Sequence, residues 1–116
     1  RNLIDAHALA LMPKGSIVIN TARGGIIDEN ALIASLNSGH THAAGLDVFA
    51  AEPLPPGSPI LSSKRVILTP HSAALTEESL IGMGVMTARN ALAGLDGALD
   101  PNLVVNRAIL ESKTHA

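Results

Sequence analysis

The chain has 116 residues, of which 47% are hydrophobic and 16% charged, and its formal net charge at pH 7 is −2. That length allows one domain with an aliphatic core, because Phe49 is the only aromatic residue. The composition gives nucleic-acid binding little support, and no apolar run reaches the roughly 18–20 residues of a membrane helix. The lack of cysteine excludes disulfides and thiolate metal sites and favours a reducing, cytoplasmic location.

The first half of the sequence predicts helices alternating with strands. In chain order we expect a helix over 6–12, a strand over 16–20, a helix over 29–38 and a strand over 43–49. Asp5 and Asp28 are N-cap candidates for the two helices, and Gly39 suits the position just after the second helix. The β-branched run at 16–20 is typical of a strand buried on both faces.

The second half predicts a Pro-rich loop over 50–63, a third strand over 65–69 and a long helix that Thr76 opens. Apolar residues cover much of the circumference of this helix, so we expect it to be buried or to contact another chain or domain. Gly82 and Gly84 inside it indicate close backbone packing. The chain is expected to be extended around residues 100–101.

Strands that alternate with helices predict a parallel sheet, whose strands all end at one edge. Ligands of such sheets bind at that edge. Arg23 follows the first predicted strand, Asp47 and Glu52 belong to or follow the second, and His71 follows the third. The sequence therefore predicts that an Arg, two carboxylates and a His meet at one edge.

Two other sequence patterns give weaker evidence of a functional site. His40 and His42 have the spacing of a metal pair, but no third ligand follows, so we interpret them as exposed turn residues and expect no metal site. Gly82-x-Gly84-x-x-Thr87 partly imitates a dinucleotide fingerprint. Because it lies inside the predicted long helix and not at a strand-to-helix turn, it is not expected to bind pyrophosphate.

Three ordered motifs carry a family resemblance: MPKGSIVINTARGGIID, AGLDVFAAEP and ILTPHSA. Over roughly residues 2–107 the chain resembles the C-terminal half of the cofactor domain of D-2-hydroxyacid dehydrogenases. The resemblance implies an α/β fold, the second half of a Rossmann-like doubly wound parallel sheet with three strands and three helices, within a longer two-domain enzyme. Residues 1–96 would belong to this domain, and 97–116 would form an extended tail toward a missing substrate domain.

The resemblance also implies a role for each matching residue. Arg23 would bind substrate, His71 would be the catalytic histidine, Glu52 its carboxylate partner, and Asp47 would hold the nicotinamide carboxamide. The implied cofactor contacts are Thr21, Ala22, Arg23, Asp47, His71, Ser72, Ala73 and Ala74. The cofactor would be NAD or NADP, and the residues that choose between them, together with the glycine fingerprint, are not in this sequence.

The chemistry of 2-keto acids suits these residue types. Arg offers a planar fork to the substrate carboxylate, His can give a proton to the developing alkoxide, and Glu52 would favour the imidazolium and orient it. Gly24 and Gly25 would keep the turn slim enough for ligands to approach. Without the other motifs, we would interpret Arg23 as part of a surface ion pair, Glu52 as a solvated loop carboxylate and His71 as a structural histidine. The order of the three motifs favours the catalytic interpretation.

We therefore expect an NAD(P)-dependent oxidoreductase that interconverts a small D-2-hydroxy acid and its 2-keto acid. The resemblance implies a homodimer formed through the cofactor domain. The 116 residues alone, without the phosphate-binding loop, are expected to bind cofactor poorly and to have little activity. A non-enzymatic NAD(H)-binding, corepressor-like scaffold and an inactive remnant stay open as alternatives.

Overall fold

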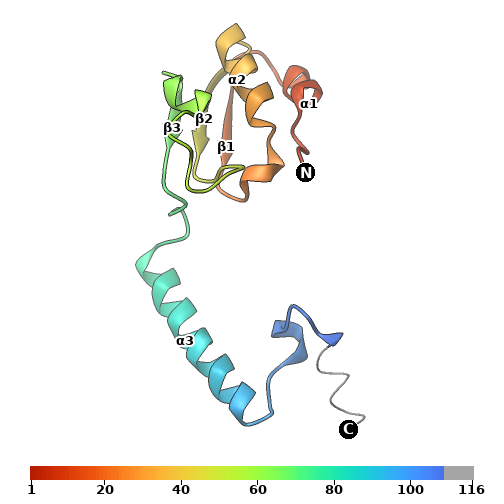
Figure 1. The fold of residues 1–116 in the computed structure, drawn as a ribbon, viewed down its shortest axis with the longest axis vertical. Helices are drawn as coiled ribbons and strands as arrows, with labels where there is room; N and C mark the ends of the chain where they lie inside the picture. The colour runs from red at the N-terminus through yellow and green to blue at the C-terminus, as the bar shows by residue number, and fades with distance from the viewer. Residues whose placement is uncertain (109–116) are drawn as a thin grey trace. The chain divides into compact units, whose positions relative to one another are not determined.

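The computed structural model describes residues 1–108, which divide between Ala74 and Leu75 into two units (Figure 1). The first unit consists of α1 (Ala6–Leu11), β1 (Ser16–Asn20), η1 (Gly24–Ile26), α2 (Glu29–Ser38), β2 (Thr41–Leu46), η2 (Pro59–Ser62) and β3 (Val66–Leu68). The second contains α3 (Glu77–Leu95) and η3 (Pro101–Leu103). The described residues thus form three helices and three strands besides short 3-10 turns, as the sequence predicts.

Local sequence signals set the ends of the first two helices. The Asp5 carboxylate accepts the Ala8 N–H at 2.9 Å, and the Asp28 carboxylate accepts the Ala31 N–H at 3.0 Å. Each contact satisfies a backbone donor that the helix itself leaves free. Gly39 ends α2 in the left-handed region with φ 74°, which glycine adopts without strain. These capping predictions are confirmed.

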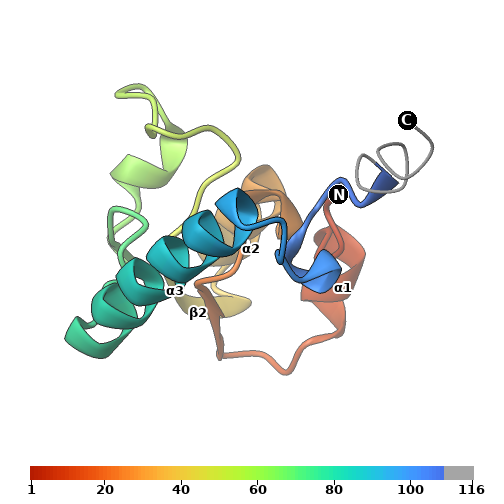
Figure 2. The same cartoon turned by 90° about the horizontal axis from the view of Figure 1, so that it is seen from below.

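The three strands form one parallel sheet in the order β1-β2-β3. In Figure 1, α1 lies toward the β1 side of the unit, and Figure 2 shows α1 next to α2, with which it is in contact. The second strand begins two residues before the predicted start and ends three residues before the predicted end, because Phe49 donates its N–H to a side chain and not to a neighbouring strand. The third strand is shorter than predicted by one residue at each end.

The core lies on one face of the sheet. Val18, Ala44 and Leu46 of the strands are buried there, and they pack with the buried side chains of Leu9, Ile27, Leu32, Leu36 and Ile60. Residues that point to the other face are exposed: Ile17 by 60%, Ile19 by 73% and Ile67 by 74%. The prediction that the first strand is buried on both faces is therefore wrong within residues 1–74, because α1 and α2 cover only one face.

The second unit begins with the long predicted helix. Thr76 caps α3 by accepting the Ser79 N–H at 3.2 Å. No residue of α3 is buried among the described residues, so of the two predicted alternatives burial is not found, and contact with another chain or domain stays a prediction. A Cβ added at Gly82 or Gly84 would likewise meet no atom within 4 Å.

The chain after α3 agrees with the prediction in part. Asp100 is extended as predicted, but Pro101–Leu103 form a 3-10 turn, since Asp100 accepts the Asn102 N–H at 2.8 Å and Pro101 fixes the first backbone angle. The predicted boundary between residues 96 and 97 stays a prediction, and the end of the predicted tail, 109–116, lies outside the described residues. Over residues 1–108, no helix is both long enough and apolar enough to cross a membrane.

Candidate active site

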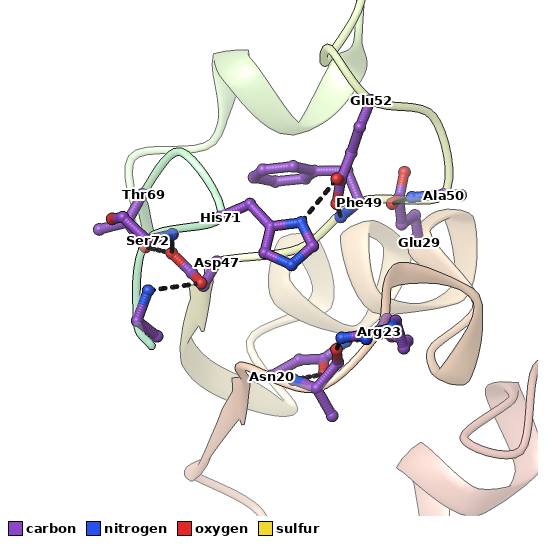
Figure 3. A network of polar contacts seen from close by, with 12 residues as sticks. Asn20, Arg23, Glu29, Asp47, Phe49, Ala50, Glu52, Thr69, His71 and Ser72 are labelled. Atoms are coloured by element: carbon purple, nitrogen blue, oxygen red, sulfur yellow. Dashed lines mark hydrogen bonds and ion pairs between the residues drawn. The ribbon is translucent and has the colours of Figure 1, made fainter. Parts of the chain in front are cut away.

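The polar residues singled out by the sequence gather beyond the carboxyl ends of the strands (Figure 3). Arg23 follows β1, Asp47 and Glu52 follow β2, and His71 follows β3. Because the strands are parallel, all three end at one edge of the sheet. The prediction that an Arg, two carboxylates and a His meet there is confirmed.

Asn20 organises the loop that carries Arg23. Its side chain is buried, its Oδ1 accepts the Ala22 N–H at 3.1 Å, and its Nδ2 donates to the Arg23 carbonyl at 2.9 Å. Arg23 itself is exposed and uses Nη1 to donate to the Ala22 carbonyl at 2.6 Å. The other N–H groups of its guanidinium form no hydrogen bond within residues 1–108, so they are free to bind an anion. The sequence prediction did not include Asn20, although a polar residue at the end of an apolar strand is a usable signal.

Gly24 brings the loops after β1 and β2 together. A Cβ at this position would overlap the carbonyl group of Phe49 and lie 2.5 Å from the Ala50 nitrogen. The space that a side chain would need is therefore filled by protein backbone. The approach of ligands at this glycine stays a prediction, and the group that the structure places against it belongs to the chain itself.

Asp47 organises the loop that carries His71. The carboxylate is only 3% exposed and accepts hydrogen bonds from the Thr69 hydroxyl, from the Ser72 N–H at 2.9 Å and from the Ala73 N–H at 2.9 Å. The Thr69 hydroxyl contributes most to lowering the pKa of Asp47, followed by the Ala73 N–H. The carboxylate is thus kept ionised, and it fixes the Thr69 side chain before His71 and the backbone of the two residues after it. Thr69 was also missed, since only its distance in space from Asp47 reveals the contact.

Glu52 and His71 form the central pair of the site. Their Oε2 and Nδ1 atoms are 2.7 Å apart, and Glu52 Oε1 accepts the Phe49 N–H at 2.9 Å. The side chains are 36% and 48% exposed. The hydrogen bond from His71 is the main cause that lowers the pKa of Glu52, with the Phe49 N–H second and the charge of Arg23 a smaller contribution. The predicted partnership is present, and it holds the carboxylate ionised.

The backbone of His71 lies in the left-handed region, with φ 54°. Such a conformation is uncommon for any residue with a side chain and costs about 1–2 kcal/mol. The two N–H groups that follow are bound by Asp47, which holds the backbone in this conformation. With Nδ1 donating to Glu52, the other ring nitrogen, Nε2, is left for a ligand (Figure 3). The arrangement can therefore bind an anion at Arg23 and exchange a proton at His71.

Small residues precede Arg23 in its loop and follow His71 in its loop. Thr21, Ala22, Ala73 and Ala74 are exposed at this edge, and Ser72 is half-buried. The N–H groups of Ser72 and Ala73 are already bound to Asp47, so any contact from these residues would use their other atoms.

The two histidines of the His40-x-His42 pattern have different surroundings. His40 is half-buried, and its Nε2 lies 3.1 Å from the Leu9 carbonyl and 3.0 Å from the Met12 carbonyl. It ties the end of α1 to the start of β2, so the prediction of an exposed turn residue is wrong for His40. His42 is exposed but lies within β2. In the part of the chain that the structure describes, no three His, Cys, Asp or Glu side chains could hold a metal ion together.

The chain matches a known protein family and is similar to curated members of known function. Residues 1–73 match the family "D-isomer specific 2-hydroxyacid dehydrogenase, NAD binding domain". The chain is 44% identical to glyoxylate reductase of Aeropyrum pernix over 111 residues, which make up 96% of this chain and 33% of that protein.

Two solved structures with related names are also similar to the chain. A glyoxylate reductase from Paecilomyes thermophila is 36% identical with a TM-score of 0.72, over 80% of this chain and 28% of that chain. A D-isomer specific 2-hydroxyacid dehydrogenase from Xanthobacter autotrophicus Py2, in complex with NADPH and MES, is 54% identical with a TM-score of 0.60, over 61% and 22%. The chain spans about a third of the length of the curated relatives it matches.

Proposed function

Because the chain belongs to the D-isomer specific 2-hydroxyacid dehydrogenase family, within its NAD-binding domain, we propose that the whole protein interconverts a small D-2-hydroxy acid and its 2-keto acid with NAD or NADP. The observation that carries the proposal is the 2.7 Å contact between Glu52 and His71, at the sheet edge where Arg23 also lies. A carboxylate, an imidazole and a guanidinium are the groups that this reaction needs from a protein.

Arg23 is proposed to bind the substrate carboxylate. Its guanidinium is exposed, while its main chain is fixed by the buried Asn20. A planar fork of N–H donors can bind both oxygens of a carboxylate at once, which orients the neighbouring carbonyl group. The rigid mount favours this role over a mobile surface ion pair.

His71 is proposed to be the acid–base residue. As an imidazolium it donates the Nε2 proton to the alkoxide that forms when the carbonyl is reduced, and in the opposite direction Nε2 accepts the hydroxyl proton. Glu52 orients the ring through Nδ1 and stabilises its charged form. Throughout the cycle Glu52 stays ionised, consistent with its lowered pKa.

The cofactor is proposed to lie against the same edge, with contacts to Thr21, Ala22, Arg23, Asp47, His71, Ser72, Ala73 and Ala74. When bound, NAD(P) supplies or takes up the hydride. Asp47 can accept one more hydrogen bond, from a carboxamide N–H, because its Oδ2 accepts one hydrogen bond and a carboxylate oxygen can accept two. The whole protein is further proposed to form a homodimer through this domain, which light scattering after gel filtration would test.

The experiment is a steady-state assay of the whole protein. Oxidation of NADH and of NADPH would be followed with glyoxylate, hydroxypyruvate and pyruvate. His71→Ala should lower kcat/KM by about 10²- to 10⁴-fold, and Arg23→Ala by about 10- to 100-fold, the loss expected for a charged hydrogen bond. The controls are His42→Ala and Arg89→Ala, which alter exposed residues of β2 and α3.

The outcomes separate the function classes. Turnover that is lost in the two site variants and kept in the two controls supports the dehydrogenase. Tight binding of NAD(H) without turnover of any of these acids would instead favour the corepressor-like scaffold. Turnover unaffected by His71→Ala and Arg23→Ala would contradict the assigned roles.

A further inference from the structure

The orientation of Glu52 depends on a bend of the chain around residues 49–52, which we call the turn. One carboxylate oxygen accepts the Phe49 N–H of this turn at 2.9 Å, and the other contacts His71 at 2.7 Å. The turn therefore aims the carboxylate at the imidazole. Whatever holds the turn in place also sets the geometry of the Glu52–His71 pair.

Glu29 binds the same turn from another element. It is the first residue of α2, it is half-buried, and its Oε1 accepts the Ala50 N–H at 2.6 Å (Figure 3). A carboxylate acceptor makes this bond short and strong. Glu29 is not needed to cap α2, because Asp28 already does so through the Ala31 N–H. Its side chain is thus committed to the loop after β2, 21 residues further along the chain.

The turn also packs against Gly24, whose missing side chain admits the backbone of Phe49 and Ala50. Consecutive residues of the turn are therefore fixed by two carboxylates, with Phe49 bound to Glu52 and Ala50 bound to Glu29. The Glu29 contact lies at an exposed position. Water can replace it as a hydrogen-bond partner, but water cannot fix the position of the turn.

We propose that Glu29 is a positioning residue for the acid–base pair, acting through the Ala50 N–H to hold Glu52 against His71. The inference rests on the proposed function and extends it to a residue on a different helix. It predicts that loss of the Glu29 carboxylate alters the protonation of His71 beyond any effect of a general loss of fold stability.

The charged groups around the imidazole come from three loops. Glu52 touches it directly, Asp47 is close enough for its pKa to respond to the charge on His71, and Arg23 acts on Glu52. If the turn is held less firmly, the contact between Glu52 and His71 weakens, while Asp47 and Arg23 stay in place. The imidazolium then loses part of its stabilisation by Glu52.

The test compares Glu29→Ala, Glu29→Gln and Glu77→Ala in the whole protein. Glu77 is the matched control, since it is the first residue of α3 as Glu29 is of α2, and Thr76 caps that helix as Asp28 caps α2. Glu29→Gln removes the charge but keeps an amide oxygen that can accept the Ala50 N–H. The readouts are the titration midpoint of the His71 ring by NMR, without substrate, and kcat/KM against pH.

Glu29→Ala should lower the His71 midpoint and move the alkaline limb of kcat/KM for keto-acid reduction to lower pH, with kcat/KM at about pH 8 reduced about three- to tenfold. Glu29→Gln and Glu77→Ala should stay close to the wild type. The urea midpoints of Glu29→Ala and Glu77→Ala should fall by similar amounts, because each loses one carboxylate from a first helical turn.

Two results would overturn the inference. In the first, Glu29→Ala keeps the wild-type midpoint of His71. In the second, Glu29→Gln behaves like Glu29→Ala, which would make the effect one of charge and not of the hydrogen bond. Failure of the proposed function looks different: the protein then turns over no keto acid, while the NMR midpoints still report whether Glu29 controls the pair.

Discussion

The Gly24→Ala substitution tests how the loop that carries Glu52 is held against the loop that carries Arg23. The new Cβ would lie 2.5 Å from the Ala50 nitrogen and closer still to the Phe49 carbonyl group. Since non-bonded heavy atoms are comfortable at about 3.5 Å, one of the two loops must move by about 1 Å or more. The obstructing atoms are backbone, so no change of side-chain rotamer can relieve the overlap. We expect the free energy of unfolding to fall by about 1–3 kcal/mol, as for other overpacked sites.

Gly25→Ala is the matched control for this prediction. Its Cβ would meet only the Cγ of Arg1 at 3.9 Å, an ordinary contact. Neither glycine has a positive φ, so alanine introduces no backbone strain at either position. Gly25→Ala should leave stability unchanged or raise it by up to about 1 kcal/mol, through a less flexible unfolded chain.

The assay is urea denaturation of the two variants and the wild type, followed by circular dichroism, with kcat/KM measured on the same samples. Gly24→Ala should lose both stability and activity, because displacing the turn moves Glu52 away from His71. Equal urea midpoints for the two variants would refute the reasoning, since backbone atoms occupy the place of a Cβ at Gly24 and do not occupy that of a Cβ at Gly25.

Three further predictions concern the core and the two carboxylates. Leu32→Ala removes a fully buried side chain and should lower the free energy of unfolding by about 2–5 kcal/mol in the same denaturation assay; a loss below about 1 kcal/mol would contradict the described core. Glu52→Gln should move the alkaline limb of kcat/KM to lower pH, because the imidazolium loses its ionised partner, and an unchanged profile would mean that Glu52 does not act on His71. The hydrogen bonds to Asp47 hold its pKa below 3.8, so the stability they provide is present above about pH 4 and is lost as the pH falls through the lowered value. Urea midpoints measured from about pH 6 to about pH 2.5 should therefore fall more steeply for the wild type than for Asp47→Asn, and parallel curves would exclude this linkage.

Much of the secondary structure follows from the sequence because its signals are local. Asp5, Asp28 and Thr76 each bond an N–H three residues further on, so the residues that start a helix are adjacent to the helix itself. Strand ends are less well predicted. The second strand ends early because Phe49 gives its N–H to the Glu52 side chain, a choice that a run of apolar letters does not reveal.

The contacts that shape the site join segments far apart in the chain. Glu29 and Ala50 are separated by 21 residues, Asp47 and Ala73 by 26, and Asp47 and Thr69 by 22. No periodicity or spacing reports such pairs. The residues that perform the proposed chemistry could be named from motifs, whereas the contacts through which Asn20, Gly24, Thr69 and Glu29 hold them could not.

The sequence by itself determined the alternation of helix and strand, the parallel sheet that follows from it, and the gathering of Arg23, Glu52 and His71 at one edge. It could do so because the strands of such a sheet share one direction, so the residues that follow them meet without further information. Only the tertiary structure decided which face of the sheet is covered and what fills the space beside Gly24. It also decided that the Asp47 carboxylate binds the loop that carries His71. These features depend on which surfaces meet after the chain has folded. The physical reason is that packing and hydrogen bonds between distant segments depend on how the segments fit together in space, which their order in the chain does not specify.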